Sequence, residues 1–600
     1  MAIRSSGQCL KKLRSLMRNL NYVPEVLHAY VIPSCDAHQS EYIADCDKRR
    51  QFMTGFSGSS GTAIVTHDDA ALWTDGRYFL QAEKQLDPNW RLVKDGVPGS
   101  PSQSEWLCKV LPPNSRVGVD PFLIPFSSWK PLATALEESG HMLIPVPENL
   151  VDMVWDDRPP PPQNPINPLS DKFTGQKWQD KIAVIRQEMV KKNCRALVLT
   201  ALDDIAYLFN MRGSDIQFNP VFFAYTVITH DSIYLFVDET KLTPLSRKHL
   251  CLDSTMSSSE SVELRPYKMI GKGSSHGLVS LIPENRRLLD LSPVTSAKAV
   301  KNETEISCMR RAHIKDAVAL CEFFAWLEEA IESESITEIS AADKLEEFRK
   351  EQDDFVGLSF ETIAGSGPNG AIIHYKPSEE TDRPLSKDEL FLVDSGAQFL
   401  DGTTDVTRTI HMGTPSQHQR ECFTRVVKGH IALASVTFPR KLQGYLLDTL
   451  ARKSLWEIGL DYAHGTSHGI GMYLNVHEGP IGIAYVPRPD DPGMSEGMFL
   501  SNEPGYYEDG KFGIRIESIV LVKKAETRHN FMDKGFLQFE TVTLVPIQTK
   551  MLDASLLSDD EVQWINAYHE TCREVVGPAL QEQERKKAYK WLMRETQPIG

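Results

Sequence analysis

Five residues in the C-terminal half of the chain have the types and spacing of ligands for divalent metal ions: Asp394, Asp405, His468, Glu503 and Glu517. Two neighbouring cations repel each other, and several anionic oxygens are needed to offset that repulsion. Four carboxylates and one imidazole meet this requirement, and a set with mostly oxygen ligands favours manganese, cobalt or zinc over copper. Two such ions can share one hydroxide and use it for hydrolysis.

The four carboxylates flank two predicted turns. An Asp-Gly pair between two strand-like runs is typical of a β-hairpin, in which the chain doubles back. A single acid near such a turn is usually an ordinary turn or edge-strand carboxylate, but a repeated arrangement favours a metal site. Each hairpin should bring two acids together: Asp394 and Asp405 across Asp401-Gly402, and Glu503 and Glu517 across Asp509-Gly510.

Six segments around these residues carry a family resemblance. In chain order they are Val393-Asp394-Ser395-Gly396, Gly402-Thr403-Thr404-Asp405-Val406-Thr407-Arg408-Thr409, His464-Gly465-Thr466-Ser467-His468-Gly469, Val476-His477-Glu478-Gly479-Pro480, Asn502-Glu503-Pro504-Gly505-Tyr506-Tyr507 and Gly513-Ile514-Arg515-Ile516-Glu517. Together they resemble the pita-bread metallopeptidases, and within that family the long cytosolic eukaryotic form of the Xaa-Pro aminopeptidases. The resemblance extends over almost the whole chain.

This resemblance implies a metal-dependent aminopeptidase that removes the N-terminal residue from peptides with proline in the second position. Cleavage would proceed through a hydroxide bridging two divalent ions, with Mn²⁺ as the expected metal. One ion would polarise the scissile carbonyl, and the other would bind the free α-amine, which an internal peptide bond lacks. The resemblance also implies a cytoplasmic homodimer.

The resemblance assigns a role to each ligand. Asp394 and Asp405 would hold one ion, whereas Asp405, His468, Glu503 and Glu517 would complete the other. Asp405 and Glu517 would therefore bridge the two ions. Glu503 would double as the general base.

Five further residues are candidates for substrate binding or proton transfer: His374, His464, His477, Tyr507 and Arg515. The three histidines match family positions that contact the substrate carbonyl and proline or shuttle protons. Arg515 lies two residues before Glu517, so on a strand both side chains point to the same face. Arg515 would orient Glu517 or bind substrate, with a structural ion pair as the alternative. Tyr507 is a candidate oxyanion donor.

One departure from the family pattern lies inside the site. Ser467 directly precedes His468 at a position where the family usually has glycine. If this position needs a positive φ, a side chain would cost about 1–2 kcal/mol and could tilt His468. We therefore expect weaker metal retention or lower turnover than in close relatives, and restoration by Ser467→Gly.

The composition agrees with a large soluble enzyme. The chain has 600 residues, with 65 Lys and Arg against 81 Asp and Glu, a net charge of −16. Because no long basic run is present, a nucleic-acid partner is not expected. No apolar stretch reaches the length of a membrane-spanning helix. The ten cysteines are dispersed without a Cys-x-x-Cys pair, which favours reduced thiols over a disulfide framework or zinc ribbon.

The N-terminal segment from Met1 to Pro24 has two interpretations. It lacks acidic residues and combines basic side chains with an amphipathic apolar stripe at Leu10, Leu13, Leu16, Met17 and Leu20. This pattern fits a mitochondrial transit peptide. It equally fits the first helix of the folded protein, which we favour because the resembled cytosolic enzymes begin in the same way.

The predicted fold class is multi-domain α/β, with two tandem creatinase-N-like α/β domains followed by a pita-bread (α+β) catalytic domain. Consecutive prolines at 159–162 cannot continue a helix or a central strand. We therefore place the end of the first domain there, and this domain comprises residues 1–160. The second domain, 161–300, is predicted to repeat the first, since a hairpin that turns on His-Asp occurs at both 63–75 and 226–238. Beside the resembled enzymes, this domain is shorter between about 262 and 295. The catalytic domain, 301–600, opens with a long helical pattern, in which apolar residues recur at three- and four-residue steps. It ends in a helical extension from 558 to 594, whose apolar anchors we expect to serve core packing: Trp564, Ile565, Tyr568, Trp591 and Leu592.

Three rival functions remain open. A prolidase-like dipeptidase shares the site but cleaves only Xaa-Pro dipeptides, and the two N-terminal domains and long tail argue against it. Creatinase-like relatives use no metal, which the complete ligand set contradicts. A catalytically impaired pita-bread protein that only binds partners is a third reading, and metal content after reconstitution would separate it.

Overall fold

The computed structural model describes residues 5–252, 261–267, 275–488 and 490–600. Contacts between Cα atoms divide the chain into two compact units. The first unit comprises residues 1–168, 178–217 and 221–290, and the second comprises 169–177, 218–220 and 291–600. Within the described residues, no helix combines the length and the apolar character that a membrane span requires.

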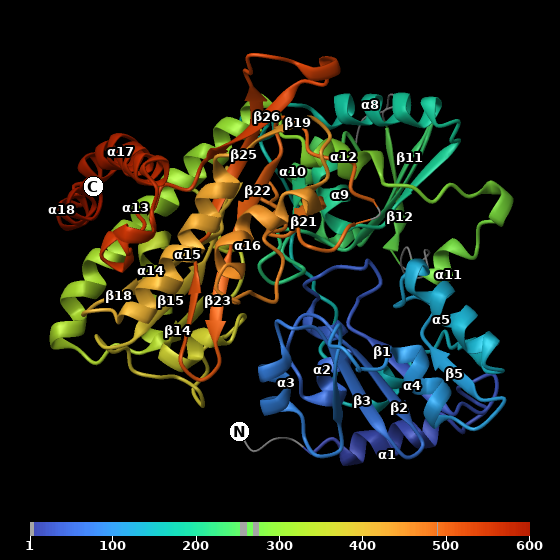
Figure 1. Cartoon of the computed structure of the whole chain (residues 1–600). Helices are drawn as coiled ribbons and strands as arrows, with labels where there is room; N and C mark the ends of the chain where they lie inside the picture. Colours follow the sequence, from blue (N-terminus) through green and yellow to red (C-terminus); the bar gives the residue numbers. More distant parts are fainter. Residues whose placement is uncertain (1–4, 253–260, 268–274, 489) are drawn as a thin grey trace. The chain divides into compact units, whose positions relative to one another are not determined.

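The first unit contains a six-stranded mixed sheet with helices on both faces (Figure 1). Its strands, in sheet order, are β4 (Arg91–Lys94), β3 (Ala70–Thr74), β2 (Thr62–Thr66), β1 (Ala29–Pro33), β5 (Arg116–Val119) and β6 (Met142–Pro145). Alternate side chains enter different cores, since successive residues of a strand point to opposite faces. Tyr30 and Ile32 join a core with helices α1 (Gly7–Leu16) and α6 (Leu150–Val154). Ala29 and Val31 join another with α4 (Gln103–Val110) and α5 (Phe126–Glu138).

The N-terminal amphipathic stripe forms part of the first core. Leu10 and Leu13 on α1 are buried, as is Met17 directly after the helix. Leu20 is 65% exposed because α1 ends at Leu16, one turn earlier than the stripe suggested. Residues 7–16 of the segment therefore form a helix of the folded unit.

A second, four-stranded sheet lies within the same unit. In order its strands are β12 (Val262–Pro266), β11 (Ile233–Val237), β10 (Ala224–Thr229) and β8 (Ala196–Leu199). The accompanying helices include α8 (Trp178–Lys191), α9 (Leu202–Leu208) and α10 (Pro244–His249). Strands β2 and β3 pair antiparallel, as do β10 and β11, which confirms both predicted His-Asp hairpins. Residues 253–260 and 268–274 lie outside the described residues, and the shortening of this region stays a prediction.

The second unit is built from antiparallel ladders covered by helices (Figure 1). One sheet has the order β14 (Ile363–Ser366), β15 (Leu390–Ser395), β18 (Val406–His411), and another has β13 (Phe355–Leu358), β16 (Ala397–Phe399), β17 (Gly402–Thr403). The largest has the order β19 (Thr437–Pro439), β26 (Phe536–Thr541), β25 (Ser518–Ala525), β22 (Phe499–Asn502), β20 (Ser467–Gly469), β21 (Glu478–Ile483). A separate hairpin joins β23 (Gly505–Glu508) to β24 (Phe512–Arg515).

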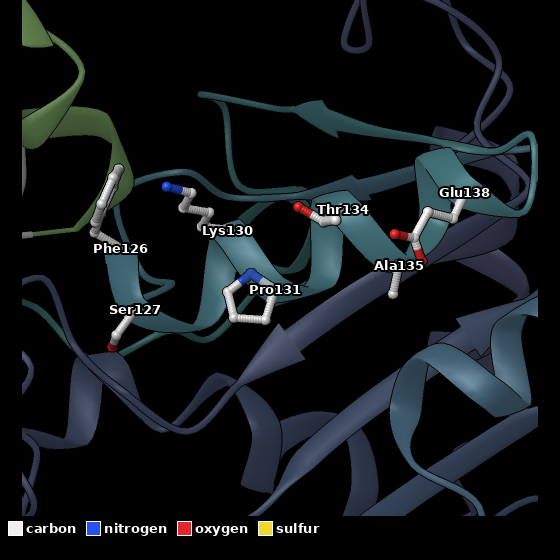
Figure 2. A pocket seen from close by; sticks show the side chains of 7 residues that line it. All are labelled: Phe126, Ser127, Lys130, Pro131, Thr134, Ala135 and Glu138. Atoms are coloured by element: carbon white, nitrogen blue, oxygen red, sulfur yellow. The ribbon is translucent and has the colours of Figure 1, made fainter. Parts of the chain in front are cut away.

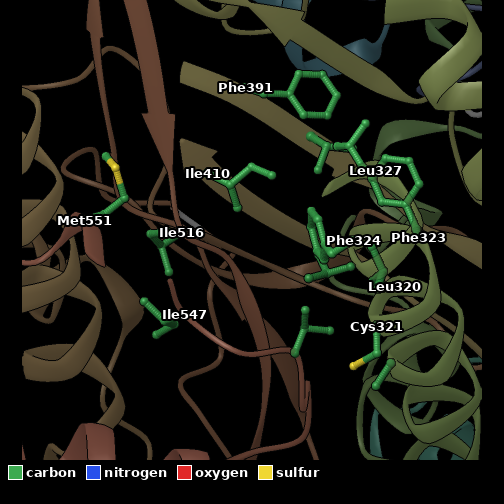
Figure 3. Close-up of a cluster of buried hydrophobic side chains, with 14 of the residues drawn as sticks. Leu320, Cys321, Phe323, Phe324, Leu327, Phe391, Ile410, Ile516, Ile547 and Met551 are labelled. Carbon is green, nitrogen blue, oxygen red and sulfur yellow. The ribbon is translucent and has the colours of Figure 1, made fainter. Parts of the chain in front are cut away.

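Helix α13 (Glu303–Ser333) is the central helix in the core of this unit. Asn302 caps it through a capping box with Glu305, which satisfies free backbone N–H groups at the helix start. Its apolar face at three- and four-residue steps is buried as predicted. Figure 3 shows Phe324 and Leu327 among the side chains that face Phe391 of β15 and its neighbours.

The other helices of the second unit include α12 (Pro293–Ala299), α14 (Glu338–Lys350), α15 (Gln417–Ala434) and α16 (Asp448–Trp456). The C-terminal extension folds as α17 (Asp559–Glu582) and α18 (Lys586–Glu595), which pack against α13 (Figure 1). Ile565, Tyr568, Trp591 and Leu592 are buried in the same core as α13, so these predicted apolar anchors serve core packing.

Candidate active site

The two aspartates meet because of the first predicted hairpin. Asp394 lies on β15 opposite Thr407 of β18, and Asp405 directly precedes β18. The reversal occurs between β16 and β17, where Phe399 pairs with Gly402. The predicted reversal is therefore confirmed, but one residue earlier than predicted: Leu400 and Asp401 form the turn, and Gly402 begins β17.

The two glutamates lie beside the second hairpin. Strands β23 and β24 pair from Gly505–Arg515 to Glu508–Phe512, and Gly510 has a φ of +73°, which favours glycine. On the other side, Asn502 of β22 pairs with Ser518 of β25. Each glutamate thus lies at a junction between two paired segments, which holds the carboxylates opposite each other.

His468 lies among the carboxylates. Its Nε2 atom is 3.3 Å from Asp405 Oδ2, 3.5 Å from Glu503 Oε1 and 3.9 Å from Glu517 Oε1. The other ring nitrogen, Nδ1, is 2.9 Å from the carbonyl oxygen of Gly469 and donates to it. Because Nδ1 is engaged in this way, Nε2 is the ring atom directed at the cluster, which is the orientation of a metal ligand.

The donor set fits divalent ions. Ligand atoms of Asp394, Asp405 and Glu517 lie within 4.8 Å of one another, as do those of His468, Glu503 and Glu517. Three buried oxygens, Asp394 Oδ1, Asp405 Oδ1 and Glu517 Oε1, have no hydrogen-bond partner among the described residues. Buried, unpaired anionic oxygens are costly unless a cation offsets them. This cluster of oxygens therefore requires positive charge.

The electrostatics of the cluster agree with that requirement. Burial, together with the negative charge of Asp405, raises the pKa of Asp394 to about 6, although Arg515 opposes the change. Burial and the negative charges of Asp405, Glu503 and Asp394 raise the pKa of Glu517 well above its usual range. Burial alone would lower the pKa of His468, but the hydrogen bond to Asp405 and the charge of Glu503 raise it to about 9. The protein alone thus leaves excess negative charge in a buried space.

Arg515 is fully buried behind the cluster. Its guanidinium donates to Asp394 Oδ2 at 2.6 Å, to Tyr507 Oη at 2.6 Å and to Thr407 Oγ1 at 3.1 Å. Thr407 in turn donates to Glu517 Oε2 at 2.7 Å. Arg515 is therefore linked to Glu517 by hydrogen bonds through Thr407, while it forms a direct ion pair with Asp394.

Tyr507 connects Arg515 to His464. Its hydroxyl oxygen lies 3.0 Å from His464 Nε2, and His464 Nδ1 is 2.8 Å from the carbonyl oxygen of Gly465. Because Nδ1 donates to that carbonyl, Nε2 accepts, and the single hydroxyl proton of Tyr507 is directed at His464. An oxyanion could receive this proton only if Tyr507 released His464.

The remaining two histidines lie on separate segments. The ring of His477 packs edge-on against His468, with ring centroids 4.3 Å apart, and its nitrogen groups with ligand atoms of Asp405 and His468. His374 is half-buried and directly follows Ile373, whose carbonyl accepts a hydrogen bond from Arg515 at 3.3 Å. The structure therefore brings His477 to the carboxylate cluster. It brings the segment that carries His374 to Arg515, which lies behind the cluster.

Two supporting residues were missed by sequence reasoning. Besides Thr407, Ser501 donates to Glu503 Oε1 at 3.2 Å and accepts the backbone N–H of His468 at 2.9 Å. Ser501 thus joins a ligand on β22 to a ligand on β20. The strand period held a signal for both, since each hydroxyl lies two residues from an acidic ligand and so on the same face.

The positive-φ premise for Ser467 is wrong, whereas the expected weaker metal retention or lower turnover stays a prediction. Ser467 lies in strand β20, paired with Ile483, and its backbone is not in the positive-φ region. A side chain at this position therefore causes no left-handed strain and no tilt of His468 from that source. The cost is different: the buried Oγ of Ser467 has no hydrogen-bond partner among the described residues.

A hollow of about 530 Å³ lies on the first unit (Figure 2). Its lining residues belong to helix α5 alone and include Phe126, Lys130 and Glu138. It shares no residue with the carboxylate cluster, so the candidate chemistry does not involve it.

Comparison with protein families identifies four matching segments. Residues 307–524 match the metallopeptidase family M24, and residues 535–599 match the C-terminal region of that family. Residues 10–154 and 157–305 each match the creatinase/prolidase N-terminal domain. The predicted fold class, with two creatinase-N-like domains before a pita-bread domain, is confirmed.

Individual relatives match over nearly their full length. The chain is 48% identical to the Xaa-Pro aminopeptidase ApepP of Drosophila melanogaster, covering 99% of this chain and 100% of the relative. It is 49% identical to a probable Xaa-Pro aminopeptidase P of Laccaria bicolor, covering 98% and 93%. The solved X-prolyl aminopeptidase of Caenorhabditis elegans, described as a cytosolic enzyme with a di-nuclear active site, matches with a TM-score of 0.94 at 40% identity, covering 99% and 100%.

Proposed function

This chain belongs to the Xaa-Pro aminopeptidases of metallopeptidase family M24, and we propose that it removes the N-terminal residue from peptides whose second residue is proline. The observation that carries this proposal is the buried cluster of carboxylates around His468, with three oxygens left without partners. In a protein core without a cation, such oxygens would be destabilising, whereas a metallopeptidase requires them as metal ligands.

The proposed cofactors are two divalent ions, with Mn²⁺ as the metal. Asp394, Asp405, His468, Glu503 and Glu517 would hold them. When bound, the ions would supply an activated water and polarise the scissile carbonyl. The di-nuclear site of the Caenorhabditis elegans enzyme supports this stoichiometry.

Glu503 is the proposed general base. Its Oε1 atom accepts from Ser501 and faces His468 Nε2, so the carboxylate is held by one hydrogen bond and is directed into the cluster. Burial raises its pKa, which brings the carboxylate closer to the strength that proton transfer at neutral pH needs.

The histidines are the proposed contacts for the substrate. His477 beside His468, His374 beyond Ile373, and His464 against Tyr507 offer ring nitrogens that bind the substrate carbonyl or carry protons. Arg515 and Tyr507 are proposed to support these contacts from behind the cluster. The scissile Xaa-Pro bond is a tertiary amide without N–H, so the site need not provide an acceptor at that position.

We further propose a cytoplasmic homodimer that acts on peptides. The cytosolic description of the Caenorhabditis elegans relative supports the location. Size-exclusion chromatography with light scattering measures the assembly: a mass near twice the 67.5 kDa of the chain is expected.

Release of free arginine tests the activity. Metal-stripped protein is loaded with Mn²⁺ and incubated with Arg-Pro-Pro, Arg-Ala-Ala and the dipeptide Arg-Pro. Manganese-dependent release from Arg-Pro-Pro, and none from Arg-Ala-Ala, is expected. Cleavage of Arg-Pro alone would show that the activity is that of a dipeptidase and not of an aminopeptidase. No cleavage of any peptide by folded, metal-loaded protein would contradict both assignments.

A further inference from the structure

A buried group of three charged side chains lies outside the ligand set. Lys301 directly precedes Asn302, the cap of α13, and Lys298 lies in α12. Both lysines contact the carboxylate of Glu478: Lys301 Nζ lies 2.5 Å from Oε1 and Lys298 Nζ lies 3.2 Å from Oε2. All three side chains are no more than 2% exposed.

Lys301 makes a further contact, to the loop that follows His468. Its ammonium donates to the carbonyl oxygen of Ile470 at 2.7 Å. Ile470 lies two residues after His468, and Glu478 directly follows His477. One ammonium group therefore joins the two segments that carry the two adjacent histidines.

The backbone around these histidines is closely fitted. Gly469 pairs with Glu478 across β20 and β21, and a register shift interrupts the ladder between His468 and Gly469. A Cβ atom on Gly469 would lie 2.2 Å from the carbonyl oxygen of Glu478, so only glycine is accommodated. At such an irregularity the ladder hydrogen bonds alone do not determine how the two segments meet. A side chain that binds both segments can fix their relative position.

Burial of the three charges is not needed for packing. Removing charged groups from water is costly, and well-packed apolar residues of similar volume are often as stable or more so. Two lysines against one glutamate also leave a net positive charge in this group. A geometric requirement accounts for such an arrangement better than stability does.

We infer that Lys301 is a positioning residue that sets the placement of His468 relative to His477, through Ile470 and Glu478. This inference rests on the proposed function, in which His468 binds a metal ion. Loss of the Lys301 contacts would let the loop after His468 move, so the Nε2 atom would no longer meet Asp405, Glu503 and Glu517 in one geometry. Supporting groups that orient a metal-bound histidine are worth about 10–100-fold in metal affinity.

The test compares Lys301→Met with Lys298→Met. Each variant leaves one lysine paired with Glu478, so the two are matched in charge and in buried volume. Metal-free wild type and variants are equilibrated at buffered free Mn²⁺ concentrations, and bound manganese per chain is measured together with the thermal unfolding midpoint of the metal-free protein. The first readout reports geometry at the site, and the second reports stability.

We expect Lys301→Met to weaken the binding of one of two ions by about 10–100-fold. Lys298→Met should stay within about threefold of wild type, and neither unfolding midpoint should fall by more than a few degrees, since each variant leaves a neutral ion pair. Equal manganese affinities in the two variants would overturn the inference and leave the proposed function standing. Wild type that binds no manganese would overturn the proposed function and the inference together.

Folding of the methionine variants is not a condition of the test. If Lys301→Met does not fold, Lys301→Gln is compared with Lys298→Gln, since glutamine keeps an N–H donor and removes the charge. The same order of manganese affinities is expected, with a smaller difference. Equal affinities in this second pair would again overturn the inference.

Discussion

Two pairs of hairpins use similar turn chemistry for different purposes. In the first unit, β2–β3 and β10–β11 reverse at His-Asp, and the turn acids Asp68 and Asp231 are exposed. In the second unit, the hairpins predicted from Asp-Gly pairs are flanked by acids of which three are buried: Asp394, Asp405 at 4% and Glu517 at 2% exposed. The turn decides where the chain doubles back. Whether the neighbouring acids become ligands depends on their burial among one another.

Neutralising a buried acid should have the largest effect. Glu517→Gln keeps the acceptor for Thr407 but removes one charge of a proposed metal ligand. We expect kcat/KM to fall by about 10³-fold or more, because a metal ligand contributes several kcal/mol to the transition state. The metal-free protein should unfold at a higher temperature than metal-free wild type, since one buried, repelled charge is gone.

The matched control is Asp231→Asn, the same loss of charge in an exposed turn of the first unit. Peptidase assays and metal-free thermal scans on both variants check the comparison. Unchanged activity is expected for Asp231→Asn. A metal-free Glu517→Gln protein that is less stable than wild type would show that the acids support the fold without a cation, and the contrast between the hairpins would fail.

The core under the catalytic hairpins should come next in size. Phe324→Ala on α13 removes a buried ring that stacks on Trp591 of α18, with ring centroids 5.5 Å apart. We expect a loss of about 3–5 kcal/mol in the free energy of unfolding, typical of a Phe-to-Ala cavity. Hydrogen exchange read by mass spectrometry should show increased exchange in the second unit. Equal increases in the β2–β3 hairpin would contradict two units with separate cores.

Removing the Tyr507 hydroxyl should have a smaller effect. In Tyr507→Phe, Arg515 loses one acceptor and His464 loses its donor. We expect about a tenfold loss of kcat/KM, equivalent to about 1.4 kcal/mol, with manganese content retained. Steady-state kinetics with Arg-Pro-Pro measure it. A loss as large as that of Glu517→Gln would assign Tyr507 to the reacting atoms rather than to their support.

The smallest effect is expected at Ser467. Ser467→Ala removes a buried hydroxyl without a partner and should stabilise the protein by up to about 1 kcal/mol, with turnover unchanged. Ser467→Gly should instead cost about 0.5–1 kcal/mol, because glycine weakens a strand. Denaturant unfolding of the three proteins checks this order. A gain of metal affinity in Ser467→Gly would restore the glycine argument that the strand geometry contradicts.

Local signals in the sequence predicted the elements, and long-range contacts limited what could be predicted of the site. The Asp-Gly turns identified both catalytic hairpins, and three- and four-residue steps identified α13. In contrast, Lys301 contacts Ile470 and Glu478, which lie 169 and 177 residues away in the sequence. No local sequence pattern predicts such contacts. The direction of the Tyr507 proton likewise depends on Gly465 and Arg515 together.

Family patterns also misled at one position. A glycine expected before His468 suggested a positive φ, but glycine is equally compatible with the strand that Ser467 occupies. The end of α1 at Leu16 shows a related limit, since the apolar stripe continues to Leu20 while the helix does not. Periodicity indicates which face is apolar, but helix ends depend on local backbone contacts.

Anomalous diffraction at the manganese edge, from crystals of the Mn²⁺-loaded protein, tests the central claim most directly. Two peaks about 3.5–4 Å apart are predicted, bounded by Asp394, Asp405, His468, Glu503 and Glu517. A single peak would contradict the two-metal site. No peak, with the carboxylates unmoved, would show that the buried acids of the second unit do not serve as ligands.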